Sequence, residues 1–140
     1  MLDTNAFIAA FKSGWTRSTD LLLELLTNQN YELVGNRVLL EEYERWAHKL
    51  GERSAEVRAQ ASTLIAVLRQ TVVLVEPEAE HIERCRPHVP EGEYADLLHA
   101  ATCLRAGAVL ISNDRHFDGL KRAGIVEVWS ISEAIRRLLG

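Results

Sequence analysis

Apolar residues recur along the chain with two different spacings, and the alternation of these spacings predicts the fold class. Short runs of apolar and β-branched residues predict strands at 31–35, 72–75, 108–112 and 125–129. Apolar positions three or four residues apart predict helices at 4–12, 19–28, 38–50, 54–70, 78–86, 93–106, 116–123 and from 131 onward. Strands that alternate with helices indicate parallel βαβ crossovers. We therefore expect an α/β protein, a three-layer α/β/α sandwich around a central, mainly parallel sheet.

Several residues mark where these elements begin and end. Ser18 or Thr19 is expected to cap the helix at 19–28, and Gly51 is expected to end the helix at 38–50. Ser130 and Glu133 have the spacing of a capping box that opens the last helix. The unbroken apolar run at 72–75 is typical of a strand covered on both faces.

Length and composition are those of a soluble globular protein. The 140 residues, 47% apolar and 26% charged, are expected to form a single domain, 1–140. No run approaches the roughly 20 apolar residues that span a bilayer, and no secretory signal is visible, so we expect a cytoplasmic protein without membrane contact. Cys85 and Cys103 lack a metal-ligand spacing and are expected to be buried free thiols.

The net charge of −4 gives the chain no overall attraction to nucleic acid. The basic residues are nevertheless unevenly chosen, with thirteen arginines and three lysines. Because arginine binds phosphate and carboxylate in a bidentate way, this bias is compatible with an RNA substrate or with an acidic partner, and it decides between neither.

The few aspartates carry the strongest chemical signal. Only five occur, and Asp3, Asp96 and Asp114 lie at predicted boundaries between strands and helices, while Glu42 follows a predicted strand. In α/β sheets such positions converge beyond the carboxyl ends of the strands. Carboxylates gathered there repel one another unless a divalent cation holds them together. The sequence therefore predicts a metal site.

Each of these acids also has a simpler interpretation. Asp3, Asp96 and Asp114 could serve only as helix caps or turn residues, a role that aspartate performs well. Glu42 could be a solvated acid on the surface of an amphipathic helix. Taken singly, the structural interpretation is favoured for each residue, and it is their joint placement that supports a site.

Four motifs, in order along nearly the whole chain, resemble those of PIN-domain ribonucleases. They are Asp3-Thr4-Asn5 after the first strand, Leu39-Leu40-Glu41-Glu42-Tyr43 on a helix, Asp96 with His99 and Ala101, and Ser112-Asn113-Asp114-Arg115-His116-Phe117 after a strand. The second motif favours Glu42 over Glu41. Only two residues precede Asp3, fewer than members of the family usually have in that strand.

The resemblance implies an endoribonuclease that depends on Mg²⁺ or Mn²⁺ and leaves a 5′-phosphate and a 3′-hydroxyl. It implies a catalytic, metal-binding set made of Asp3, Glu42, Asp96 and Asp114. Hydroxyl, amide and carboxylate groups nearby are expected to assist, namely those of Thr4, Asn5, Ser112, Asn113 and Asp118. Glu93 is a further candidate accessory group, and His99 could bind phosphate or form a hydrogen bond within the protein.

The length and family resemblance favour a VapC-like toxin of a toxin–antitoxin pair, which implies an RNA substrate, a small antitoxin partner and a homodimer. Two alternatives remain open at this point. One is a housekeeping RNA-processing nuclease of the same fold, and the other is a catalytically silent scaffold that binds a partner. The complete acidic quartet argues against the scaffold, because a pure scaffold gains nothing from acids that repel one another.

Overall fold

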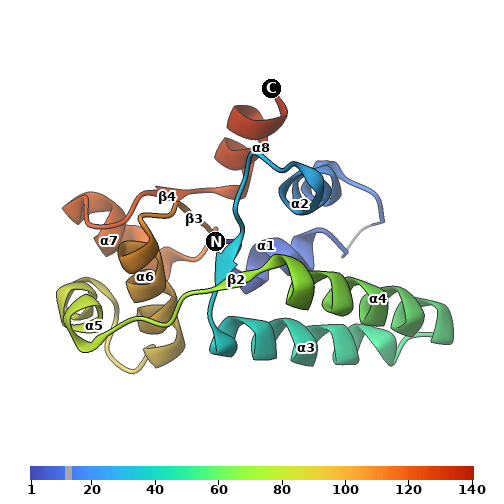
Figure 1. Cartoon of the computed structure of the whole chain (residues 1–140), viewed down its shortest axis with the longest axis horizontal. Coiled ribbons are helices and arrows are strands. Elements are labelled where there is room, and N and C mark those ends of the chain that lie inside the picture. The colour runs from blue at the N-terminus through green and yellow to red at the C-terminus, as the bar shows by residue number, and fades with distance from the viewer. Residues whose placement is uncertain (12–13) are drawn as a thin grey trace.

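The computed structural model of the protein describes residues 1–11 and 14–140, and it alternates helices with short strands (Figure 1). In chain order the elements are α1 (Thr4–Ala9), α2 (Arg17–Thr27), β1 (Val34–Gly35), α3 (Arg37–Gly51), α4 (Ala55–Thr71), β2 (Val73–Leu74), α5 (Ala79–Cys85), the 3₁₀ turn η1 (Arg86–His88), α6 (Tyr94–Ala106), β3 (Leu110–Ile111), the 3₁₀ turn η2 (Arg115–Phe117), α7 (Asp118–Ala123), β4 (Val128–Trp129) and α8 (Ile131–Leu139). This order confirms the predicted α/β class.

The strands pair in parallel wherever the described residues form a ladder. β1 pairs with β2, β3 pairs with β4, and Leu2 forms a parallel bridge with Ile111 of β3. β3 therefore lies between the start of the chain and β4. The strands are shorter than the apolar runs predicted, because each ladder spans only two residues on each strand.

Helices lie on both sides of these strands, which gives the expected three-layer α/β/α arrangement. In Figure 1, α3 and α4 run side by side as a long hairpin, while α5, α6 and α7 gather at the opposite end. A single cluster of buried apolar side chains extends from Met1 to Ala134. Within it the rings of Phe7 and Tyr43 stack with their centroids 4.5 Å apart, which joins α1 to α3.

Two of the sequence predictions about elements were wrong. Val73 and Leu74 are 44% and 49% exposed, so β2 is not covered on both faces. Its only strand partner within the described residues is β1, and an unbroken apolar run therefore occurs here in an edge strand. The cap of α2 is Thr16 rather than Ser18 or Thr19, and Thr19 instead accepts a hydrogen bond from the Thr16 amide at 3.1 Å.

Other local predictions are confirmed. Ser130 caps α8 and accepts a hydrogen bond from the Glu133 amide at 3.1 Å. Gly51 lies at the last position of α3, as expected of a residue that ends a helix. Cys85 and Cys103 are buried free thiols, and burial raises the pKa of each to about 11, which keeps them protonated and unreactive. No helix in the described part of the chain has the length and apolar character needed to cross a membrane.

Candidate metal centre

Asp3 lies between the bridge that Leu2 forms with β3 and the first residue of α1. Its amide donates to the Ile111 carbonyl at 3.0 Å, so the start of the chain is anchored to β3. One carboxylate oxygen caps α1 by accepting from the Thr4 amide at 2.8 Å, and the other accepts from the Ser112 hydroxyl at 2.6 Å. The residue is only 5% exposed. Asp3 is thus a helix cap and a buried carboxylate at once.

Burial raises the pKa of Asp3 above its ordinary value, and the hydrogen bonds from Ser112 and the Thr4 amide offset this only in part. The negative charge of Asp96 raises the pKa of Asp3 further. The ionised form of Asp3 is therefore costly in the folded protein, and a bound cation would remove that cost.

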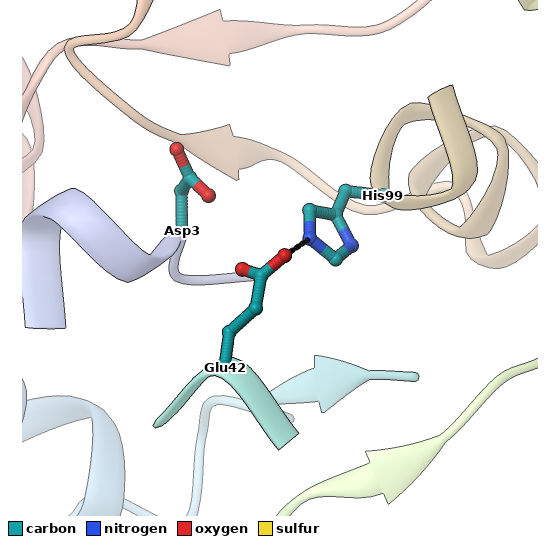
Figure 2. Close-up of side chains that lie close together, drawn as sticks. All are labelled: Asp3, Glu42 and His99. Atoms are coloured by element: carbon teal, nitrogen blue, oxygen red, sulfur yellow. Dashed lines mark hydrogen bonds and ion pairs between the residues drawn. The ribbon is translucent and has the colours of Figure 1, made fainter. Parts of the chain in front are cut away.

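Glu42 projects from α3 toward Asp3, and Figure 2 shows the two carboxylates on either side of a small gap with His99 beside them. The Thr4 hydroxyl donates to one Glu42 oxygen, and His99 Nε2 lies 3.2 Å from the other. Burial raises the pKa of Glu42, but the hydrogen bonds from His99 and Thr4 outweigh it and hold the pKa below its ordinary value. The neighbouring Glu41 is exposed, which agrees with the choice of Glu42 from the motif.

The orientation of His99 is set by a chain of hydrogen bonds that begins at the cap of α3. Asn36 Oδ1 accepts from the Leu39 amide at 2.8 Å, which identifies the other end of the Asn36 side chain as its NH₂ group. That group donates to Thr102 Oγ1 at 3.0 Å and to His99 Nδ1 at 3.1 Å. His99 Nδ1 is therefore an acceptor, so the ring proton lies on Nε2 and is donated to Glu42.

Asp96 and Asp114 are joined through His116. Asp96 lies in the first turn of α6, and its Oδ2 is 2.7 Å from His116 Nδ1. Asp114 caps η2 by accepting from the His116 amide at 2.9 Å, and its Oδ1 is 3.4 Å from the same ring nitrogen. Glu93 lies 3.8 Å from this nitrogen as well. One imidazole thus faces three carboxylates.

The pKa values of this second group show the same competition between burial and charge. Burial raises the pKa of Asp96, the hydrogen bond from His116 lowers it, and the charge of Asp114 raises it, with a net upward shift. The hydrogen bond with Asp96 in turn raises the pKa of His116. A positive charge is favoured at this position because of the surrounding acids.

The two groups form one connected cluster. Ser112 donates to Asp3 and accepts from the Asp114 amide at 3.0 Å, so one hydroxyl links the first and fourth acids. Single ligand atoms of Asp3, Glu42 and His99 all lie within 4.8 Å of one another, and the same holds for Glu93, Asp96 and His116. The structure therefore brings the four predicted acids into one region, in two subgroups rather than one tight ring.

Comparison with known proteins shows the family to which this chain belongs. The family model of the PIN domain matches residues 1–123. This chain belongs to the PIN domain family. The PIN domain is similar in structure to VapBC-1 from nontypeable Haemophilus influenzae, with a TM-score of 0.62 and 23% identity over 94% of this chain and 97% of that chain.

A second similar structure is VapBC2 from Rickettsia felis bound to a DNA fragment from its promoter, with a TM-score of 0.62 and 19% identity over 93% of this PIN domain and 96% of that chain. At these identities the likeness shows the fold alone. A search of curated proteins found no significant match. The predicted family and the predicted fold class are both confirmed.

The predicted accessory residues of the PIN domain differ in whether they contact the acids. Thr4 and Ser112 contact the acids directly. Asn5 lies 3.4 Å from the Ser112 hydroxyl, whereas the Asn113 side chain accepts from the Ile131 amide and so connects the site to the start of α8. Asp118 is exposed at the start of α7 and belongs to neither acidic subgroup.

Sequence reasoning missed two residues that organise the cluster. His116 enters the sequence analysis only as part of the fourth motif, although its position two residues after Asp114 allows a tight turn to bring it back to that acid. Asn36 is not among the residues that the sequence analysis singles out, whereas it caps α3 and also holds His99. Its place directly before a helix was the available signal.

The donors present suit a divalent cation that prefers oxygen. Asp3 and Glu42 offer carboxylate oxygens at close range, and the cost of ionising the buried Asp3 is the cost that a cation relieves. Both ring nitrogens of His99 are engaged, one by Asn36 and one by Glu42, so this histidine orients Glu42 and offers no unengaged nitrogen to a cation. The carboxylates are therefore the candidate ligands of a cation at this site.

Proposed function

We propose that this PIN domain, acting as a single domain of 140 residues, is an endoribonuclease that requires Mg²⁺ or Mn²⁺ to hydrolyse RNA phosphodiester bonds. One observation carries the proposal. The buried carboxyl of Asp3 lies beside Glu42, and its pKa is raised by burial and by the charge of Asp96. A protein that did not bind cations would gain nothing from placing Asp96 where its charge makes Asp3 harder to ionise, and Asp114 where its charge makes Asp96 harder to ionise.

The residues have distinct roles in this proposal. Asp3, Glu42, Asp96 and Asp114 would hold the cation directly or through its waters, and the cation would supply a more acidic water and neutralise charge on the phosphate. Ser112 and the Thr4 amide orient Asp3. The Thr4 hydroxyl and His99 orient Glu42, and His116 holds Asp96 and Asp114 together.

A toxin role with an antitoxin partner and a homodimer is the form of this function that we favour. The similar structures are VapBC complexes, and the PIN domain leaves large apolar side chains exposed on three successive helices, with Leu23, Trp46 and Val67 each 37–40% exposed. Such side chains suit contacts between proteins.

A housekeeping RNA-processing nuclease is the alternative. Growth arrest on induced expression, relieved by a small protein encoded next to it, would support the toxin, and normal growth would support the processing enzyme.

Removing divalent metal is expected to stop cleavage of RNA by the purified protein, and Mg²⁺ or Mn²⁺ is expected to restore it. The metal is also expected to raise the thermal unfolding temperature, because a ligand that binds only the folded state stabilises it. Gel analysis of end-labelled RNA with EDTA, followed by metal addition, measures the first effect, and scanning calorimetry measures the second. Cleavage that persists in EDTA would show that the proposed chemistry is wrong.

A further inference from the structure

An open hollow of about 660 Å³ lies directly beside the acidic cluster. Its walls come from η1, the loop after it, η2 and α7, and its lining includes His88, Arg115, His116 and Arg122. His116 belongs to both places, because its ring lines the hollow while Nδ1 contacts Asp96. Its volume falls within the roughly 300–1,000 Å³ of ordinary ligand sites. A ligand held in the hollow would therefore lie against His116, beside the candidate metal centre.

The hollow is basic in a protein that is acidic overall. Arg115 and Arg122 line it together with His88, against a single carboxylate, that of Asp118. Both arginines are exposed, and within residues 1–11 and 14–140 neither forms an ion pair. A guanidinium presents paired N–H donors that match the oxygens of a phosphate. In the part of the chain that the structure describes, both guanidinium groups are therefore available to a ligand.

The wall that carries these residues is preformed. A Cβ atom placed on Gly119 would lie 2.5 Å from the His88 carbonyl oxygen, so the backbones of α7 and η1 are in direct contact. Only glycine permits this approach. The contact fixes α7 against η1, the turn that carries His88. Arg122 lies in the last turn of α7, so its backbone and that of His88 are already held together on one side of the hollow.

A second, smaller hollow continues the surface past Val89 and Pro90, which line both. It carries Tyr94, whose side chain is 59% exposed at the start of α6, two residues before Asp96. An exposed aromatic ring beside a basic groove is the combination by which proteins hold unpaired nucleic acid, with the backbone on the cations and a base on the ring. The acids Glu91 and Glu93 also line this second hollow, and its one cation, Arg86, is paired with Glu83, so it suits a base better than a phosphate.

We propose that the arginine hollow, defined by His88, Arg115 and Arg122, binds backbone phosphates of single-stranded RNA next to the bond to be cut, with a base stacked on Tyr94. The identity of the strand as RNA rests on the proposed function. The geometry itself selects an unpaired strand, because the flanking base is exposed to Tyr94 only when it is not paired. An acidic protein segment is the other class of ligand for two arginines, and the experiment separates it from RNA.

The test is a binding measurement without metal, so that cleavage does not enter. Fluorescence anisotropy in EDTA would follow a labelled single-stranded RNA of about twelve nucleotides, a length within the range that such sites cover. Arg115→Glu with Arg122→Glu is expected to weaken binding at least about tenfold. The same double variant is expected to reduce the slope of log affinity against log salt by about 1.4, which is two phosphate contacts at about 0.7 each. Tyr94→Ala is expected to weaken binding about tenfold with an unchanged slope.

The matched control is Arg53→Glu with Arg136→Glu, which makes the same change in net charge at two exposed arginines outside both hollows. Circular dichroism checks that each variant is folded, and Arg115→Gln with Arg122→Gln gives a milder test if the charge reversal disturbs the fold. An equal loss of affinity in the control would show only a general effect of charge and would overturn the proposal. Tight binding of duplex RNA, or no RNA binding by the unsubstituted protein, would overturn it as well.

Two further outcomes separate this proposal from an acidic-peptide site and from the proposed nuclease function. If the arginine variants bind RNA normally but lose binding to a polyglutamate peptide, the hollow is a site for an acidic protein segment and the proposal is wrong. If the unsubstituted protein binds RNA through the hollow but does not cleave it with Mg²⁺ or Mn²⁺, the proposed nuclease function fails while the binding site stands.

Discussion

Replacing Asp3 with asparagine is expected to reduce RNA cleavage by at least about 100-fold, because even residues that only support metal ligands typically contribute 10- to 100-fold. The same variant is expected to be more stable than the unsubstituted protein when no metal is present. Asparagine keeps an oxygen to cap α1 at the Thr4 amide, and its NH₂ group can donate to Ser112 Oγ in place of the bond that Ser112 donates to Asp3. It has no charge that burial penalises. A loss of function together with a gain of stability distinguishes a metal ligand from a residue required for folding.

The pH dependence of this gain follows from the direction of the pKa shift. The pKa of Asp3 is raised in the folded state above the ordinary value of 3.8, so the folded state binds the proton more tightly than the unfolded state. Below pH 3.8 both states are protonated, and the variant and the unsubstituted protein should be similarly stable. As the pH rises through the folded-state pKa, the unsubstituted protein loses stability and the variant does not. The gap should therefore widen toward neutral pH.

Urea unfolding in EDTA at several pH values measures this gap, and a labelled RNA measures the loss of cleavage. Asp20→Asn is the matched control, since Asp20 pairs with Arg17 on α2, away from the acidic cluster. The control should cleave RNA at the unsubstituted rate. Full activity of Asp3→Asn would contradict the assignment of this residue, and a stability gap that narrows as pH rises would contradict the burial argument.

The sequence indicated the acids because their positions follow from local rules. Asp3 directly follows a short apolar run and Asp114 comes three residues after another, and in a parallel sheet the ends of such runs meet at one edge. The motif preferred Glu42 to Glu41, and the structure places the former beside Asp3 and leaves the latter exposed. The roles of these acids as metal ligands remain predictions, but the sequence did predict that the acids lie close together in space.

Thr4 and Ser112 were expected to assist the acids, but the pairing of Asn36 with His99 and of His116 with Asp96 could not be read from the sequence, because each pair joins distant parts of the chain. Asn36 and His99 are 63 residues apart, and His116 reaches Asp96 across 20 residues. Periodicity states which face of a helix is apolar, but it does not state which polar side chains meet across the core. The exposure of Val73 and Leu74 was missed for a related reason, since an apolar run does not reveal whether a strand lies at an edge or in the middle of a sheet.

Substitutions of His99 are expected to show that it positions Glu42 instead of merely filling space. In His99→Gln the terminal amide can still donate to Glu42 in place of Nε2, while in His99→Asn the shorter side chain can still accept from Asn36 in place of Nδ1. Each variant loses one of the two buried hydrogen bonds, so each is expected to cost about 1–3 kcal/mol of stability. A purely structural histidine would therefore give two equivalent variants.

A positioning role gives unequal variants. We expect His99→Gln to cleave RNA within about tenfold of the unsubstituted rate and His99→Asn to lose about 10- to 100-fold, the range found when a residue that holds a metal ligand is removed. Calorimetric titration with Mn²⁺ should show the same order, with weaker binding for the asparagine variant, because Glu42 then loses the donor that fixes one of its oxygens. Equal activity and equal Mn²⁺ affinity in the two variants would assign His99 to the core alone. Unequal values at matched stability would mean that the donor at the Nε2 position of His99, the nitrogen that faces Glu42 while Asn36 holds Nδ1, fixes the geometry of the Glu42 carboxylate.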